Sequence, residues 1–235
     1  MDKKSNDDVA LNIEEIRRNV DEAARECGRD PKDITIMAVT KTVAPERVNK
    51  AIENGITLLG ENRAQELLEK YDSYDKDGVD IHFIGHLQTN KVRQIIDKVT
   101  MIHSVDSVHL AQEIDRQAGK AGIVMKVLAE VNIGGEESKS GISPEELPQL
   151  LEEMSRMPNL SVQGLMTIPP VSRTNEEAEH YFCKMSQLFI DINQKNMDNI
   201  NMNILSMGMS GDYRTAIKYG ATIVRIGTAL FGSRR

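Results

Sequence analysis

The chain has 235 residues, enough for one sizeable domain with a full core, and its 40% hydrophobic and 28% charged residues are ordinary for a soluble globular protein. The net charge of −7 argues against nucleic acid as a main partner, because phosphate backbones attract basic surfaces. No apolar run approaches the length of a bilayer span, and the polar residues 1–8 carry no secretory signal, so we expect a cytoplasmic, non-membrane protein.

The first predicted element is a helix that precedes every predicted strand. Gly28 and Pro31 are expected to end it. Its apolar residues recur at alternating spacings of four and three, which places them on one helical stripe: Val9, Ile13, Ile16, Val20, Ala23 and Cys27.

Strand and helix patterns alternate over the rest of the chain. Two capping boxes, Ser143-Pro-Glu-Glu146 and Thr174-Asn-Glu-Glu177, mark helix starts. The expected strands are 34–39, 57–60, 81–84, 101–105, 125–133, 162–167, 204–207 and 223–226. The expected helices are 45–53, 62–70, 90–97, 107–118, those opened by the two capping boxes, and 212–219.

This strict alternation is typical of parallel strands joined by helical crossovers, and eight such units close into a barrel. The rival fold is an open doubly wound sheet, but the G-x-G-x-x-G fingerprint of its dinucleotide-binding members does not follow the first strand here. We therefore predict an α/β protein, a single-domain (β/α)8 TIM barrel over residues 1–235. The chain stops too soon for a full eighth helix, and we expect the extra N-terminal helix to cover that gap.

Two loops near the end of the chain fit a phosphate site, which many barrels place after strands seven and eight. Met207-Gly-Met-Ser-Gly-Asp212 leads into a helix, so Ser210 offers a hydroxyl beside backbone N–H donors at the positive end of the helix dipole. Gly227 and Thr228 add a bare backbone N–H and a second hydroxyl after the last strand. The alternative is that Ser210 or Asp212 only caps the helix and that the glycines form turns.

Lys41 ends the first strand after an apolar run, and that strand neighbours the eighth in a closed barrel. A lysine desolvated at the mouth has a lowered pKa and can form an imine with an aldehyde, whereas most strand-ending lysines are solvated charges. Arg225 interrupts the last strand. Inside the barrel its guanidinium needs an acceptor, either a core carboxylate or the pyridine nitrogen of pyridoxal 5′-phosphate (PLP). The amine and the phosphate loops together suggest PLP.

The histidines do not predict a metal site. Along an extended strand His82 and His86 lie roughly 13 Å apart, too far to share an ion unless the chain turns at Gly85. The other three histidines show no ligand spacing, and no Gly-x-Ser-x-Gly elbow marks a serine hydrolase.

Several motifs, spread over nearly the whole chain, resemble one family. They include Ala38-Val-Thr-Lys-Thr42, Gly60-Glu-Asn-Arg-Ala-Gln-Glu66, His82-Phe-Ile-Gly-His-Leu-Gln-Thr-Asn-Lys91, Gly164-Leu-Met-Thr-Ile-Pro-Pro170 and the stretch 205–232. These stretches look like those of the pyridoxal phosphate homeostasis proteins, which bind PLP on the barrel of the alanine racemase (fold-type III) group. Two positions depart from the pattern, because Arg63 stands where the family often has an aromatic residue and Val43 where it often has a lysine.

The resemblance implies a role for each candidate residue. Lys41 would be the Schiff-base lysine and Arg225 the partner of the pyridine nitrogen. The phosphate binders would be Ser210, Gly227 and Thr228, with Met209 beside them, and the ring would be lined by Asn62, Ile84, His86 and Met166.

The resemblance also implies storage and delivery of PLP inside the cell, without strong catalytic turnover. We expect PLP-dependent apo-enzymes as acceptors and a monomer or weak dimer. The rival function is an amino-acid racemase or decarboxylase of fold-type III. Racemisation needs acid–base groups on both faces of the substrate, and Lys41 serves one face while no residues remain for a second domain. A third reading is a sugar-phosphate enzyme in which Lys41 forms an aldolase-type Schiff base with its substrate.

Overall fold

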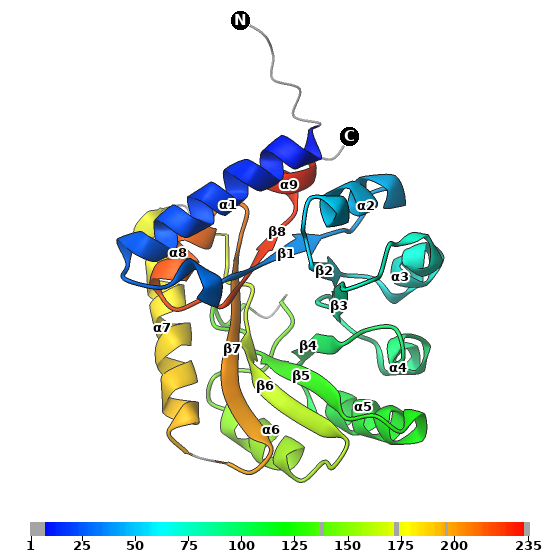
Figure 1. Cartoon of the computed structure of the whole chain (residues 1–235). Coiled ribbons are helices and arrows are strands. Elements are labelled where there is room, and N and C mark those ends of the chain that lie inside the picture. The colour runs from blue at the N-terminus through cyan, green and yellow to red at the C-terminus, as the bar shows by residue number, and fades with distance from the viewer. Residues whose placement is uncertain (1–7, 137–138, 172–173, 196, 233–235) are drawn as a thin grey trace, which may run out of the picture.

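The structure, a computed structural model, describes residues 8–136, 139–171, 174–195 and 197–232. Eight parallel strands follow one another in chain order around a closed barrel (Figure 1). The first strand pairs with both the second and the eighth, which confirms the predicted (β/α)8 barrel. The strands are β1 (Thr35–Val39), β2 (Leu58–Glu61), β3 (Asp80–Phe83), β4 (Met101–Val105), β5 (Met125–Glu130), β6 (Leu160–Met166), β7 (Ile200–Met209) and β8 (Ile223–Ile226).

Helices surround the barrel, and α1 packs against α2, α8 and α9 (Figure 1). The prediction that the N-terminal helix covers the gap beside the last strand is therefore confirmed. The helices are α1 (Val9–Glu26), α2 (Pro45–Glu53), α3 (Ala64–Lys70), α4 (Thr89–Ile95), α5 (Val108–Ala121), α6 (Leu147–Ser155), α7 (Asn175–Asn193), α8 (Tyr213–Lys218) and α9 (Thr228–Phe231), with short 3₁₀ turns η1 (Pro31–Asp33) and η2 (Tyr71–Ser73).

Some boundaries differ from those expected. The helix α5 continues through Gly119 to Ala121, because the left-handed residue that ends it is Gly122, with φ of +68°. Ser143 Oγ accepts the Glu146 N–H as the capping box predicts, but the Glu146 carboxylate accepts the Ser143 hydroxyl and not its backbone N–H. The residues between them form a turn, and α6 begins only at Leu147. The strand β7 is longer than the predicted 204–207, and the four-residue α9 was not predicted.

The apolar core has an outer layer and an interior. The outer layer packs the helices against the barrel. The barrel interior holds smaller apolar clusters, including Met37, Leu58, Ile84 and Ile223, and polar side chains share that interior near the carboxyl ends of the strands. One close approach matters for the site: a Cβ at Gly85 would lie 2.1 Å from the Asn62 carbonyl oxygen, so only glycine lets these two loops pack together. Among the described residues, no helix combines the length and the apolar run that crossing a bilayer requires.

Candidate functional site

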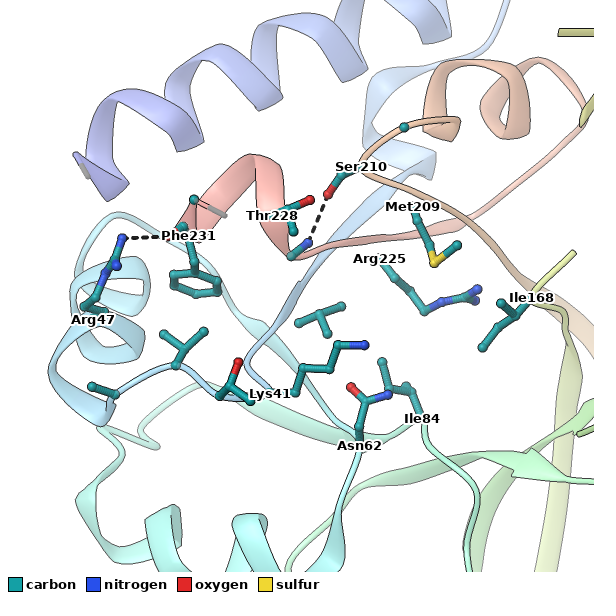
Figure 2. A pocket seen from close by; sticks show the side chains of 17 residues that line it. Lys41, Arg47, Asn62, Ile84, Ile168, Met209, Ser210, Arg225, Thr228 and Phe231 are labelled. Carbon is teal, nitrogen blue, oxygen red and sulfur yellow. Dashed lines mark hydrogen bonds between the residues drawn. The ribbon is translucent and has the colours of Figure 1, made fainter. Parts of the chain in front are cut away.

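A cavity of about 650 Å³ opens at the carboxyl ends of the strands, where barrels place their active and binding sites. Its walls come from both ends of the chain, since β1 and β8 are neighbours in the closed barrel. Eight of the ten predicted ligand residues line it (Figure 2): Lys41, Asn62, Ile84, Met209, Ser210, Arg225, Gly227 and Thr228.

Lys41 is the second residue after the end of β1 and is half-buried. Along this strand the alternation of side chains places Val39 and Lys41 on the interior face, and both line the cavity. Figure 2 shows the Lys41 side chain extending into the cavity, toward the space that the Asn62 and Arg225 side chains also face. The amine is thus presented to a ligand in the cavity rather than to the helices outside.

Ser210 links the loop after β7 to the start of α9. Its Oγ accepts the backbone N–H of Gly227 at 3.3 Å (Figure 2). It also accepts the backbone N–H of Ala229 at 3.2 Å. A serine hydroxyl has two lone pairs and one hydrogen, so the hydrogen is the part left to contact an anion in the cavity. Asp212 has a different role, since its carboxylate accepts the Met209 N–H at 2.6 Å and closes the loop. The loops after β7 and β8, which the sequence predicts as a phosphate site, therefore meet. They meet at the start of α9, whereas the sequence pointed to the start of α8.

Arg225 lies in the barrel interior and is almost fully buried. One terminal nitrogen donates to the carbonyl oxygen and Oγ of Ser206, both at 2.8 Å, and the other donates to the Thr167 carbonyl oxygen at 2.7 Å. These acceptors are uncharged, so the hydrogen bonds of Arg225 do not go to a core carboxylate, which was one of the two acceptors considered from the sequence. Burial lowers the pKa of Arg225 to about 10, against the opposing effect of Glu130 and Asp212, so at neutral pH the guanidinium keeps its charge.

A pair of buried histidines continues from Ser206 across the barrel interior. The His103 Nδ1 lies 3.2 Å from the Ser206 Oγ, and the His103 Nε2 lies 2.9 Å from the His82 Nδ1. Burial lowers the pKa of His82 to about 4 and holds the pKa of His103 well below its usual range. Both rings are therefore neutral at pH 7, and each short contact joins one hydrogen to one lone pair. His82 thus has His103 as its partner, and not the His86 considered for a metal site.

Two of the ten predicted residues are not brought to the cavity wall. After the turn at Gly85, His86 has 61% of its side chain exposed and lies 3.9 Å from the Asp106 carboxylate. Met166 is completely buried and packs with Met101 and Leu128 in the barrel interior.

Other residues near the cavity were not singled out from the sequence. Ile168 and Phe231 line it and lie inside motifs that carried the family resemblance, so the motifs were the available signal. Glu130 ends β5 with its side chain buried, and its Oε2 has no hydrogen-bond partner within the part of the chain that the structure describes. Burial, with the Asp106 charge, raises the pKa of Glu130 to about 7. Its signal was the same as that of Lys41, a charged residue ending an apolar strand.

Residues 11–235 match the family model described as alanine racemase, N-terminal domain. The fold and the cavity thus define a barrel of the alanine racemase class. Within that class, the pyridoxal phosphate homeostasis protein of Aquifex aeolicus (strain VF5) is 43% identical over 223 residues, which cover 95% of this chain and 97% of that protein. The homeostasis protein of Escherichia coli (strain K12) is 35% identical, covering 97% of each chain. The chain belongs to the pyridoxal phosphate homeostasis protein family.

Solved structures agree with this assignment. PipY of Synechococcus elongatus PCC7942, solved with PLP bound, superposes with a TM-score of 0.80 at 30% identity, covering 95% of this chain and all of PipY. An alanine racemase of Clostridium difficile 630 has a TM-score of 0.75 at 19% identity. This chain covers 56% of that racemase, and the likeness shows the shared fold alone.

Proposed function

We propose that this chain binds PLP covalently as a Schiff base on Lys41 and serves to store and deliver PLP inside the cell. The observation that carries the proposal is the convergence of an amine, a buried cation and the Ser210 loop on one cavity. Membership of the homeostasis family and the PLP bound to PipY support it. The proposal treats residues 1–235 as one PLP-binding unit in the cytoplasm, acting as a monomer or weak dimer.

The residues present fit the chemistry of PLP. The cavity exceeds the lower end of small-ligand pockets, about 300 Å³. Asn62 Oδ1 is buried without a hydrogen-bond partner among the described residues, as expected of a group that awaits a ligand. The apolar side chains of Ile84, Ile168 and Met209 suit a planar ring. A phosphate dianion suits the donors around Ser210.

Each group has a distinct task in this proposal. When bound, the cofactor supplies an aldehyde, whose carbon forms a C=N bond with Lys41 Nζ while its oxygen leaves as water. Ser210, Gly227 and Thr228 hold the phosphate, and Asn62 with Ile84 orients the ring. Arg225 donates to the ring nitrogen. Because the guanidinium keeps its proton at neutral pH, that nitrogen stays unprotonated and the ring is a poor electron sink.

This electrostatic arrangement favours a carrier over the rival racemase or decarboxylase. Those reactions would require the ring to withdraw electrons from the α-carbon of the substrate, which an unprotonated pyridine does weakly. The buried histidines are held neutral and already engage each other and Ser206, so neither is an obvious acid or base for a substrate. The acceptors of the stored PLP would be PLP-dependent apo-enzymes.

An absorbance spectrum of the purified protein tests this function. PLP bound to an amine is yellow, whereas the sugar phosphate of an aldolase-type enzyme is colourless. We expect a visible band that disappears in Lys41→Ala and survives in Lys50→Ala, whose lysine lies on the exposed surface of α2. Transfer is measured by adding the loaded protein to an apo-enzyme and following the activity regained. A colourless protein that binds no added PLP would contradict the proposal.

A further inference from the structure

An ion pair on α3 holds the segment that carries Lys41. Glu66 Oε1 accepts the backbone N–H of Thr42 at 2.5 Å, and Lys70 Nζ donates to the carbonyl oxygen of Thr40 at 3.2 Å. The two side chains also pair with each other, one turn apart on the same helix. Only 15% and 14% of these side chains is exposed, so solvent screens the pair weakly.

The two backbone groups that Glu66 and Lys70 contact flank the Lys41 Cα. The carbonyl of Thr40 belongs to the peptide plane before it, and the N–H of Thr42 belongs to the peptide plane after it. Because peptide groups are planar, the orientations of these two planes are the φ and ψ of Lys41. Holding both planes therefore fixes the direction in which the Lys41 side chain leaves the backbone.

The plane after Lys41 depends most on this contact. Thr42 has φ of +61°, in the left-handed region that a β-branched residue rarely adopts. By contrast, Thr40 is anchored independently, because its N–H donates to the Gly60 carbonyl and its hydroxyl donates to the buried Glu61 carboxylate. The Val43 N–H donates to the Thr40 carbonyl oxygen at 3.0 Å and closes a turn with Lys41 and Thr42 at its centre. That bond does not involve the central Lys41–Thr42 peptide, so without the Glu66 carboxylate this peptide could rotate within the turn toward a conformation that relieves Thr42, and take the lysine side chain with it.

We propose that Glu66, held in place by Lys70, is a positioning residue that aims Lys41 into the cavity and so sets the rate of covalent PLP capture. Neither residue is among those that line the cavity. The inference rests on the proposed function of Lys41 and adds to it a determinant outside the ligand contacts.

The experiment separates covalent capture from binding. The purified protein is freed of PLP with hydroxylamine, and two quantities are then measured for wild type, Glu66→Ala, Glu66→Gln and Glu69→Ala. The first is the rate at which added PLP becomes fixed to Lys41 by borohydride. The second is the affinity for 4-deoxypyridoxine 5′-phosphate, which has the ring and the phosphate but no aldehyde. Glu69 is the matched control, because it is exposed on α3 and accepts from Gln65.

We expect Glu66→Ala to slow capture roughly 10-fold or more, since small misplacements of a reacting group cost at least that much. Its affinity for the deoxy analogue should change less than about twofold. Glu66→Gln keeps an oxygen that can accept the Thr42 N–H, so it should restore part of the rate, and Glu69→Ala should match the wild type.

An unchanged capture rate in Glu66→Ala would overturn the positioning role alone. So would an equal loss of capture and of analogue affinity, which would indicate general damage to the cavity. Absence of any adduct on Lys41 in the wild type would instead overturn the proposed function, and the positioning role with it. Thermal unfolding of each variant checks the fold, and Glu66→Gln keeps the test decisive where Glu66→Ala is unstable.

Discussion

Replacing Ser210 by alanine tests how the cavity would hold a phosphate. The change removes the Oγ that joins the β7 loop to the start of α9, together with the hydroxyl hydrogen that would contact the anion. Lys41 and Arg225 are on other strands and stay in place. The variant should therefore weaken binding of the phosphate without altering the amine.

The size of the effect follows from the contacts. A hydrogen bond to a charged group contributes about 1.5–3 kcal/mol, which corresponds to about a 10-fold to 150-fold loss of affinity. In the variant the N–H groups of Gly227 and Ala229 lose their serine acceptor and become available to the phosphate, which offsets part of the loss. We therefore expect PLP affinity to fall about 10-fold, the lower end of that range.

The assay is a titration of the PLP-free protein with PLP and with pyridoxal, which lacks the phosphate. Ser210→Ala should weaken PLP binding and leave the weak binding of pyridoxal unchanged. Ser155→Ala serves as the control, because that serine is only partly exposed at the end of α6, outside the cavity, and donates to a backbone carbonyl there. Equal losses for PLP and pyridoxal would show that Ser210 does not serve the phosphate and would refute the reasoning.

Three further predictions concern stability and turnover. Burial raises the pKa of Glu130 in the folded protein to about 7, from an ordinary 4.5. The folded protein therefore holds this proton more tightly than the unfolded chain, and the resulting contribution to the free energy of unfolding, about 3 kcal/mol, is complete below pH 4.5 and is lost as the pH rises to about 7. In Glu130→Gln, the free energy of unfolding measured in urea should not show this fall with pH. A variant with the same pH dependence as the wild type would contradict the prediction. Thr42→Asn should raise the free energy of unfolding by about 1 kcal/mol in urea, because asparagine tolerates positive φ; a destabilised variant would show that Thr42 is not strained. Deuterium exchange at the α-carbon of L- and D-amino acids should be slow or absent with PLP bound, whereas exchange at many turnovers per second that is lost in Lys41→Ala would make the protein a racemase.

The fold was largely readable from the sequence because the long helices are amphipathic and the strands between them are short buried runs. The predicted bounds of 45–53, 101–105 and 223–226 match α2, β4 and β8. The misses were elements whose ends depend on tertiary contacts. The strand β7 extends because it pairs with β6 and β8, and α9 is only four residues long, too short to show a helical period.

The site was readable where a residue stands out on its own strand. Lys41 ends an apolar strand and Arg225 interrupts one, and together with the two loops predicted to hold phosphate they pointed to the barrel mouth. Pairings between elements left no such mark. The His82–His103 contact joins two strands, and the contact of Glu66 with Thr42 joins a helix to a loop. His86 is turned outward by the chain after Gly85, a direction that the motif alone does not specify.

The central claim is that PLP is attached to Lys41, and peptide mapping after borohydride reduction tests it most directly. Reduction converts the C=N bond into a stable amine, so digestion and mass spectrometry locate the modified residue. The account predicts a single modified peptide that contains Lys41, and no modified peptide from Lys41→Ala. A stable adduct on another lysine, formed equally in wild type and in Lys41→Ala, would contradict it.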